Sequence, residues 1–191
     1  MLRPGDYLGV RPRRVVVAGA SGAGKTTLAA RLAVDLGVPH VELDALHHGP
    51  GWVPRPLFTA DVDAFTTRPG WVTEWGYGAT RDVLAGRADL LVWLDLPRAV
   101  VMRQVVRRTL RRRLRREVLW NGNVEPPLRT FFTDEEHIVR WAWTSFARLG
   151  ERVEALATTV PALPVVRLRS HAEAEAWRRG PLATAGAGRA P

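Results

Sequence analysis

The sequence predicts an α/β layer fold, with a mostly parallel sheet of about five strands and helices on both faces. Two observations along the 191-residue chain predict it: short β-branched or apolar runs recur, and a stretch with helical character follows each run. Right-handed crossovers then make neighbouring strands parallel and place helices on both faces. In such sheets a ligand binds beyond the carboxyl ends of the strands.

The elements can be assigned in chain order. Strands are expected at residues 14–18, 39–43, 71–74, 90–94 and 164–168. Helices are expected at 25–36, at 57–67, from 97 to about 115, from 133, and after Ser170, which is a favourable N-cap. The predicted organisation is an N-terminal extension at 1–13, one domain at 14–179 with a lid segment at about 111–132, and a disordered tail at 180–191.

The predicted helix that begins near Pro97 is long and amphipathic. Its apolar residues recur at helical spacing, which leaves the arginines for the opposite face. The residues expected to face the core are Met102, Val105, Val106, Leu110 and Leu114.

Composition restricts the class of protein. With 46% hydrophobic and 25% charged residues, the chain can bury one core, and its length favours a single domain. The absence of cysteine excludes disulfides, thiolate metal sites and a cysteine nucleophile. Residues 1–14 lack the apolar core of a signal peptide, and no apolar run approaches membrane-spanning length. We therefore expect a cytoplasmic protein with no membrane partner.

The net charge of +9 comes from one segment. Residues 97–116 contain nine arginines and no acid, while the rest of the chain has 19 basic and 19 acidic residues. General attraction to DNA or to a membrane needs a broad basic face, whereas one dense stripe can equally serve a bound polyphosphate.

A phosphate-binding motif follows the first predicted strand and opens the first predicted helix. It satisfies the pattern G-x-x-x-x-G-K-[ST], with the residues Gly19, Ala20, Ser21, Gly22, Ala23, Gly24, Lys25 and Thr26. The glycines let backbone N–H groups point inward, and the helix adds its positive end. This combination predicts a P-loop NTPase fold that binds ATP and Mg²⁺.

Each polar side chain of the motif has an expected role. Lys25 can reach between the β- and γ-phosphates, the Thr26 hydroxyl can ligate Mg²⁺, and Thr27 is expected to touch the α-phosphate. Lys25 is also the only lysine in the chain, where every other cationic side chain except histidine is arginine. A compact ammonium at this position suits contact with a transferring phosphate.

Beyond this motif, the sequence resembles the adenylate-kinase-like P-loop kinases, and among them the small bacterial DNA topology modulation proteins. The resemblance covers most of residues 14–178. It rests on the segments 19–27, 43–46 (Leu-Asp-Ala-Leu), 49–52 (Gly-Pro-Gly-Trp), 94–98 (Leu-Asp-Leu-Pro-Arg), 141–143 (Trp-Ala-Trp) and 167–170 (Arg-Leu-Arg-Ser). The chain departs from the family at 71–77 (Trp-Val-Thr-Glu-Trp-Gly-Tyr), where Asp-Gly-Asn-Tyr is usual.

The resemblance implies roles for three carboxylates. Asp44 follows the second strand, where related kinases have a carboxylate that orients the acceptor hydroxyl or takes its proton; the alternative is a turn-capping aspartate. Glu74 ends the third strand and is expected near Mg²⁺ and its water shell; the alternative is a surface acid. Asp95 ranks below Glu74, because its position in the family favours a structural role.

The arginines divide into two groups. Arg103, Arg107 and Arg108 form the R-x-x-x-R-R arrangement that begins the lid of adenylate kinases, which implies Arg103 near the ATP base and Arg107 on phosphate. Arg103 and Arg107 are four residues apart and share a helix face, so both could meet one nucleotide. Residues 111–116 leave three interpretations, in this order: a solvated face, a nucleic-acid patch, or a grip on a polyanionic acceptor.

These observations predict an ATP-dependent kinase that transfers the γ-phosphoryl group to a small acceptor. Nucleosides, nucleotides and small hydroxylated metabolites all remain as acceptors, and the oligomeric state stays open. The alternative is a nucleic-acid-associated P-loop ATPase that affects DNA topology. The confinement of the arginines to one segment without aromatic residues disfavours that alternative. A binding module with little turnover would predict no acceptor-side acid, yet Asp44 is present.

Overall fold

The computed structural model of the chain describes residues 1–115, 117–123 and 138–186. Its centre is a five-stranded sheet in the order β2-β3-β1-β4-β5, in which every pair of neighbouring strands is parallel. The strands are β1 (Arg14–Gly19), β2 (His40–Val41), β3 (Trp71–Glu74), β4 (Leu90–Leu94) and β5 (Val165–Leu168). The central strand β1 pairs with β3 through Val15 and Val72, and with β4 through Val15 and Leu90.

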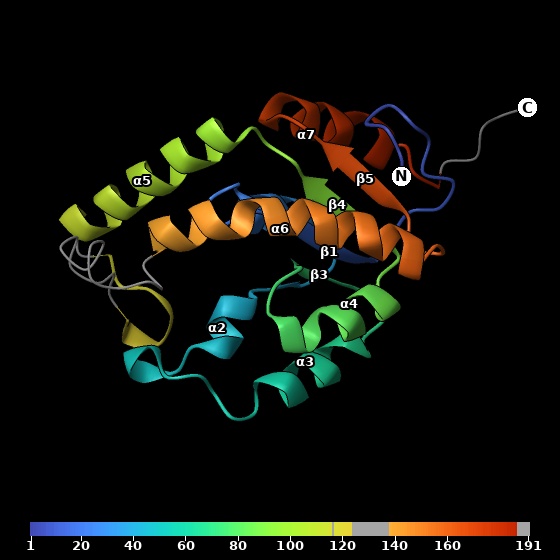
Figure 1. Ribbon diagram of the computed structural model, residues 1–191. Coiled ribbons are helices and arrows are strands. Elements are labelled where there is room, and N and C mark those ends of the chain that lie inside the picture. The colour runs from blue at the N-terminus through green and yellow to red at the C-terminus, as the bar shows by residue number, and fades with distance from the viewer. Residues whose placement is uncertain (116, 124–137, 187–191) are drawn as a thin grey trace, which may run out of the picture.

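Helices cover both faces of this sheet (Figure 1). The helices are α1 (Lys25–Leu36), α2 (Leu43–His47), α3 (Phe58–Thr66), α4 (Arg81–Arg87), α5 (Arg98–Arg115), α6 (Ile138–Thr159) and α7 (His171–Trp177). Shorter helical turns are η1 (Pro50–Trp52), η2 (Gly78–Thr80), η3 (Trp120–Gly122) and η5 (Arg178–Leu182). The predicted α/β class with a parallel five-stranded sheet is confirmed.

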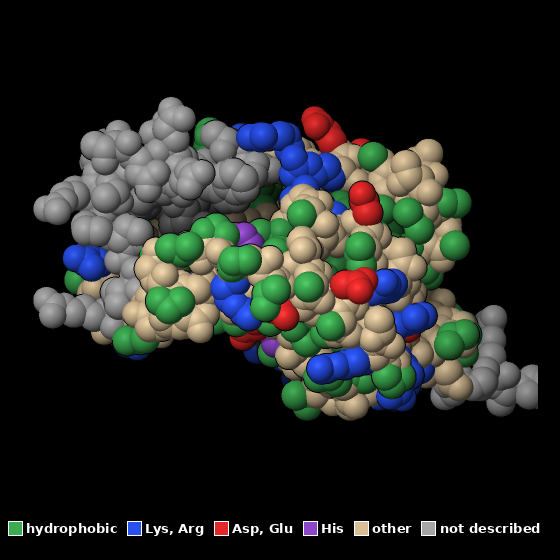
Figure 2. Space-filling model, turned by 90° about the horizontal axis from the view of Figure 1, so that it is seen from below, with side chains coloured by type: hydrophobic (Ala, Val, Ile, Leu, Met, Phe, Trp, Pro, Cys, Tyr) green, Lys and Arg blue, Asp and Glu red, His purple; other side chains and the backbone are tan. Residues whose placement is uncertain are grey.

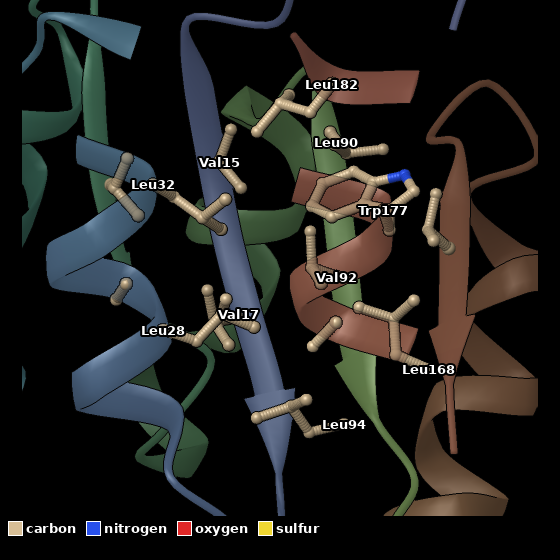
Figure 3. Packing of buried hydrophobic residues seen from close by; sticks show 14 of the residues in the cluster. Val15, Val17, Leu28, Leu32, Leu90, Val92, Leu94, Leu168, Trp177 and Leu182 are labelled. Carbon is tan, nitrogen blue, oxygen red and sulfur yellow. The ribbon is translucent and has the colours of Figure 1, made fainter. Parts of the chain in front are cut away.

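Alternate residues of each strand supply two separate cores. On one face, Val15 and Val17 of β1 pack with α1, α7 and the start of α5, and Trp177 of α7 lies beside Val92 (Figure 3). On the other face, Val16 and Ala18 pack with α3, α4 and α6. Because side chains alternate along a strand, a strand buried on both faces is apolar throughout, as β4 is and as β1 is after Arg14.

The second strand is shorter than the sequence predicts. A strand was expected at 39–43, but β2 ends at Val41 and α2 begins at Leu43. The Glu74 carboxylate accepts a hydrogen bond from the Leu43 N–H, 3.3 Å away, and so provides one of the partners that a helix N-terminus needs. That partner lies 31 residues away in the sequence, so local propensity could not show it.

The buried face of α5 also differs from the expected one. Val101, Val105 and Thr109 are buried, whereas Val106, Leu110 and Leu114 are 40%, 41% and 82% exposed. The helix packs along an i, i+4 row on one flank of the predicted apolar stripe. Trp143 of α6 is 55% exposed, and the Arg98 guanidinium stacks 3.4 Å from its ring centroid.

Both ends of the described chain, near Leu2 and up to residue 186, lie against the domain. Leu2 forms a bridge with Val166 of β5, beyond the predicted domain boundary at residue 14. A disordered tail was expected from Gly180, but up to residue 186 the chain packs on the core: Leu182 and Ala185 are 2% and 4% exposed. Leu182 contacts the core on the α1 and α7 face, so this part of the tail buries enough apolar surface to be held (Figure 3).

The predicted lid at 111–132 is described only in part. Residues 111–115 continue α5, and 117–123 include η3. Residues 116 and 124–132, and the helix start expected at 133, lie outside the described residues. Among the described helices, none combines the length and the hydropathy that crossing a membrane requires.

Candidate functional site

The P-loop connects β1 to α1 at the carboxyl end of the central strand. Gly22 and Gly24 have φ of +87° and +91°, in the left-handed region that suits glycine. Gly24 is also the N-cap of α1. A Cβ atom at Gly22 would clash with Cγ2 of Val105, so α5 packs directly on the loop. Glycine is therefore required at both positions by backbone conformation, and at Gly22 also by the packing of Val105.

The backbone of the loop offers hydrogen-bond donors. Within the described part of the chain, no carbonyl accepts a hydrogen bond from the N–H groups of Gly24, Lys25 or Thr26. These groups lie at the start of a twelve-residue helix, whose dipole adds positive potential there. Loop and helix together present the backbone donors and the positive helix end that the motif predicts for anion binding.

Lys25 lies between the loop and two carboxylates. Its Nζ donates a hydrogen bond to the Ala20 carbonyl, 3.1 Å away. Burial lowers the pKa of Lys25, the charges of Asp44 and Glu74 oppose that effect, and the charge of Arg108 adds to it. The structure thus brings Lys25, Asp44 and Glu74 into one electrostatic neighbourhood, although they lie on α1, α2 and β3.

Glu74 holds the start of α2 in place. Its Oε1 is 3.2 Å from His40 Nε2, and its Oε2 accepts from the Leu43 N–H. Burial alone would raise the pKa of Glu74, but the hydrogen bond and charge of His40, together with backbone hydrogen bonds that include the one from Leu43, leave the pKa below its ordinary value. Because Asp44 is the second residue of α2, the position of Asp44 depends on Glu74.

A hydrogen-bonded cluster surrounds Asp44. The Tyr77 hydroxyl donates to Asp44 Oδ1 at 2.6 Å and lies 3.2 Å from His48 Nε2. The Tyr77 ring stacks on His47 with centroids 4.1 Å apart, and Phe58 meets the same ring edge-on at 5.0 Å. Burial, followed by the nearby charge of His48, lowers the pKa of His47, and the charge of Asp44 opposes this.

Tyr77 has an unusual backbone conformation for an aromatic residue. Its φ is +53°, in the region where a Cβ atom crowds the backbone. Such a conformation costs about 1–3 kcal/mol and persists only where surrounding contacts compensate. The sequence does not show the bond from Tyr77 to Asp44, because the two residues are 33 positions apart.

The η3 turn packs on the loop that follows α2. The Trp120 Nε1–H donates to Glu42 Oε2 at 2.7 Å, and Asn123 Nδ2 donates to the Gly49 carbonyl at 2.9 Å. Asn123 also accepts from the Trp52 N–H through Oδ1, and Asn121 donates to the His48 carbonyl. The turn lies within the segment predicted as a lid, and its Trp-Asn-Gly-Asn sequence is a turn signal.

The structure separates the arginines that the sequence grouped together. Arg103 and Arg107 are exposed and, at 100° per residue, lie about 160° around α5 from Val105, which packs on the P-loop. Arg108 is half-buried, and its charge is the one that reaches Lys25. The structure therefore places Arg108 on the Lys25 side of α5 and leaves Arg103 and Arg107 on the other face of the helix.

Two further groups lie at the carboxyl ends of the strands. Asp95 forms an ion pair with Arg167, with 2.5 Å between Oδ2 and Nη2, and so ties β4 to β5. His171 at the start of α7 lies beside Gly24, where an added Cβ would be 3.3 Å from the imidazole Cε1. Gln104 of α5 is 2.8 Å from His171 Nε2 through its side-chain nitrogen. Sequence reasoning did not find this pair, because neither residue belongs to a motif.

The fit of a Mg²⁺ ion can be judged from the donor groups. In the described ranges, no cluster of three or more His, Asp or Glu side chains is arranged to hold a metal. The described residues therefore do not form a metal site made of protein carboxylates alone. Mg²⁺ in nucleotide sites uses one or two protein oxygens, phosphate oxygens and water. The half-buried Thr26, at the start of α1, fits that donor set.

Comparison with known proteins gives a likeness of fold. A shikimate kinase from Acinetobacter baumannii, in complex with shikimate, has a TM-score of 0.52 at 16% identity and covers 87% of this chain and 89% of its own. A shikimate kinase from Bacteroides thetaiotaomicron has a TM-score of 0.49 at 19% identity, covering 88% and 95%. A gluconokinase from Sinorhizobium meliloti 1021 has a TM-score of 0.41 at 24% identity, covering 76% and 98%.

No protein-family model and no curated protein sequence matches the chain. At these identities the likeness shows the fold and not the activity. The chain therefore has a P-loop fold of the kind found in shikimate kinase. The phosphate-binding loop is at the expected strand end of that fold.

Proposed function

We propose that the chain is an ATP-dependent kinase that transfers the γ-phosphoryl group to a small hydroxylated acceptor. One observation carries the proposal: Lys25 of the P-loop lies within electrostatic range of Asp44, a carboxylate on a separate element. A P-loop ATPase needs the first group, whereas a kinase needs both a phosphate clamp and an acceptor-side acid. The likeness of fold to small-molecule kinases supports the same reaction class.

The proposed reaction is an in-line displacement. The acceptor hydroxyl oxygen forms a bond to the γ-phosphorus, the bond between that phosphorus and the β,γ-bridging oxygen breaks, and ADP leaves. The acceptor proton passes to the Asp44 carboxylate. Lys25 and the N–H groups at the start of α1 stabilise the negative charge on the phosphoryl oxygens, and Arg108 adds a third cationic group on the same side.

Mg²⁺ would supply charge neutralisation between the β- and γ-phosphates when bound. Thr26 would hold it through the hydroxyl oxygen. Glu74 would act on the ion only through water, because both carboxylate oxygens already have protein partners in His40 and Leu43. The principal contribution of Glu74 in this proposal is to fix the start of α2 and, with it, Asp44.

The arginines of the outer α5 face keep two proposed roles. The family resemblance assigns Arg103 to the ATP base and Arg107 to phosphate. Both side chains would have to extend around α5 to reach the P-loop. Arg108 needs no such path. We therefore propose Arg108 as the principal arginine of the phosphate side, and Arg103 and Arg107 as the assignment that mutagenesis must test.

The experiment is a measurement of ADP release from ATP and Mg²⁺ across nucleosides, nucleotides, shikimate, gluconate and other small hydroxylated compounds. We expect at least one acceptor to raise ADP release well above the rate without acceptor. The phosphorylated product, detected by mass spectrometry, must equal the ADP formed. ADP release that no acceptor increases would contradict the kinase proposal.

A second candidate function is a nucleic-acid-associated ATPase, as the resemblance to DNA topology modulation proteins implies. One observation favours it: Arg103, Arg107, Arg111 and Arg115 form an exposed row at four-residue spacing along α5. The rise of 1.5 Å per residue separates neighbours in this row by about 6 Å, so the row presents a line of positive charge along α5. Elsewhere the basic side chains are scattered among acidic and hydrophobic ones on the face in Figure 2. Stimulation of ATP turnover by DNA would favour this function over transfer to a small acceptor.

A further inference from the structure

Tyr77 is held in its strained conformation by its side chain. It lies between Gly76 and Gly78, three residues after the end of β3 at Glu74, and a Cβ atom at Gly78 would meet nothing within 4 Å. The flanking glycines leave this segment conformational freedom, so the left-handed backbone at Tyr77 is not imposed by its neighbours in sequence. The hydroxyl bond to Asp44 and the stack on His47 are the contacts that compensate.

The Tyr77 hydroxyl binds Asp44 as an acceptor hydroxyl would. Both are O–H groups that donate to a carboxylate oxygen, and the bond from Tyr77 to Asp44 Oδ1 is short, at 2.6 Å. Burial, and then the charge and hydrogen bond of Asp44, raise the pKa of Tyr77 far above its ordinary value. The phenol therefore keeps its proton near neutral pH and acts toward Asp44 only as a donor.

The hydrogen bond from Tyr77 to Asp44 also affects the transfer of the γ-phosphoryl group to water. A P-loop kinase must prevent a water molecule from taking the place of the acceptor hydroxyl. In that side reaction the water oxygen bonds to the γ-phosphorus, the bond to the β,γ-bridging oxygen breaks, and the water proton passes to Asp44, which gives ADP and inorganic phosphate. A carboxylate that already accepts a hydrogen bond from Tyr77 and carries less available charge is a weaker base for this step.

We propose that the Tyr77 hydroxyl occupies the acceptor position on Asp44, so that Asp44 takes a proton only after a bound acceptor has displaced Tyr77. Tyr77 is then a specificity-determining residue that selects the acceptor over water. The inference rests on the proposed kinase function and deepens it. Displacement also releases the strained φ, and His48, which contacts the same hydroxyl, provides a second partner toward which it can turn.

The experiment compares Tyr77→Phe with the wild type. The substitution keeps the ring that stacks on His47 and removes only the hydroxyl. Tyr7→Phe is the matched control, because Tyr7 is the other tyrosine of the chain, is 48% exposed and donates a hydrogen bond to the nearby Gly9 carbonyl. Three quantities are measured: ADP release without acceptor, the ratio of phosphorylated acceptor to ADP, and the acceptor KM.

We expect Tyr77→Phe to increase acceptor-independent ADP release by roughly tenfold or more, since freeing a general base is worth about 10²–10⁴-fold at most. The ratio of phosphorylated acceptor to ADP should fall, and the acceptor KM should fall because a competitor has been removed. Adding Asp44→Asn to Tyr77→Phe should abolish the increase. Tyr7→Phe should leave all three quantities unchanged.

A merely structural Tyr77 gives a different result. In that case Tyr77→Phe would lower phosphoryl transfer, leave the ratio of product to ADP unchanged and not increase ADP release, and this outcome would overturn the inference. Failure of the kinase proposal gives another result, because the wild type would then transfer phosphate to no acceptor. An increase in ADP release by Tyr77→Phe would still support the blocking role of the Tyr77 hydroxyl. If no variant releases ADP, both proposals fall.

Discussion

The phosphate side and the acceptor side of the candidate site are built in different ways. Nine consecutive residues, 19–27, form the P-loop and the start of α1, and two glycines in the left-handed region set its shape. The acceptor side consists of α2, the end of β3, the segment around Tyr77 and η3. Side-chain hydrogen bonds between residues more than 30 positions apart connect these parts.

This difference predicts different responses to mutation. A loop whose shape comes from its own backbone tolerates the loss of a side chain without losing its fold, so mutations there should change chemistry alone. A surface held by long-range hydrogen bonds depends on each partner, so mutations there should change chemistry, stability and pH response together. Four measurements test the comparison, from the largest expected effect to the smallest.

Lys25→Ala should have the largest effect. We expect a loss of about 10³-fold in ADP release, because a preorganised cation at the transferring phosphate is removed, with little change in the melting temperature. Steady-state kinetics and thermal unfolding are measured on the same preparation. Arg31→Ala, at an exposed position of the same helix, is the control. Near-normal turnover in folded Lys25→Ala would remove the P-loop from the mechanism.

Asp44→Asn should separate the two sides of the site. The substitution preserves shape and removes the charge, so we expect transfer to fall by about 10²-fold while the ATP dissociation constant changes little. Asp82→Asn, an exposed acid in α4, is the control. Equal losses in transfer and in ATP affinity would instead indicate that Asp44 only supports the local fold.

Glu74→Gln should reveal the stability of the acceptor side. The pKa of Glu74 is lowered from its ordinary 4.5, so its carboxylate stabilises the fold above that pH, and the contribution is lost as the pH falls through the lower folded-state pKa. We expect Glu74→Gln to lose about 2 kcal/mol of unfolding free energy at pH 7. The difference from wild type should close below about pH 4.

Denaturant unfolding from pH 3 to 8 measures this difference. Lys25→Ala, on the phosphate side, should show the same pH dependence as the wild type between pH 3 and 6. A constant gap between Glu74→Gln and the wild type at every pH would mean that the lost contribution is packing and not charge.

The arginines should give the smallest effect. We expect Arg108→Ala to lower transfer by about tenfold, because its charge lies on the Lys25 side of α5, and Arg103→Ala or Arg107→Ala to lower it by less than about threefold. The reverse order would restore the assignment implied by the adenylate-kinase resemblance.

A DNA titration at several salt concentrations on the same variants tests the outer row, since each lost phosphate contact reduces the salt slope by about one.

Much of the fold and the phosphate side could be read from sequence, because both depend on short-range patterns. Continuous apolar runs predicted β1 and β4, and the glycine spacing with its flanking strand and helix predicted the P-loop. The α5 boundary followed from Pro97. The buried face of α5 could not be read from the sequence, because valines and leucines lie on both flanks of the helix. Only the packing of Val105 on Gly22 shows which flank is buried.

The acceptor side was decided by tertiary structure. The sequence identified Asp44 through a family resemblance, but the contacts that position it, from Glu74 to Leu43 and from Tyr77 to Asp44, join residues more than 30 positions apart. The end of β2 at Val41 and the packing of Leu182 likewise depend on distant partners. The physical reason is common to all of them: hydrogen bonding and burial act between surfaces that only the folded chain brings together, whereas backbone conformation and periodicity act between neighbours in sequence.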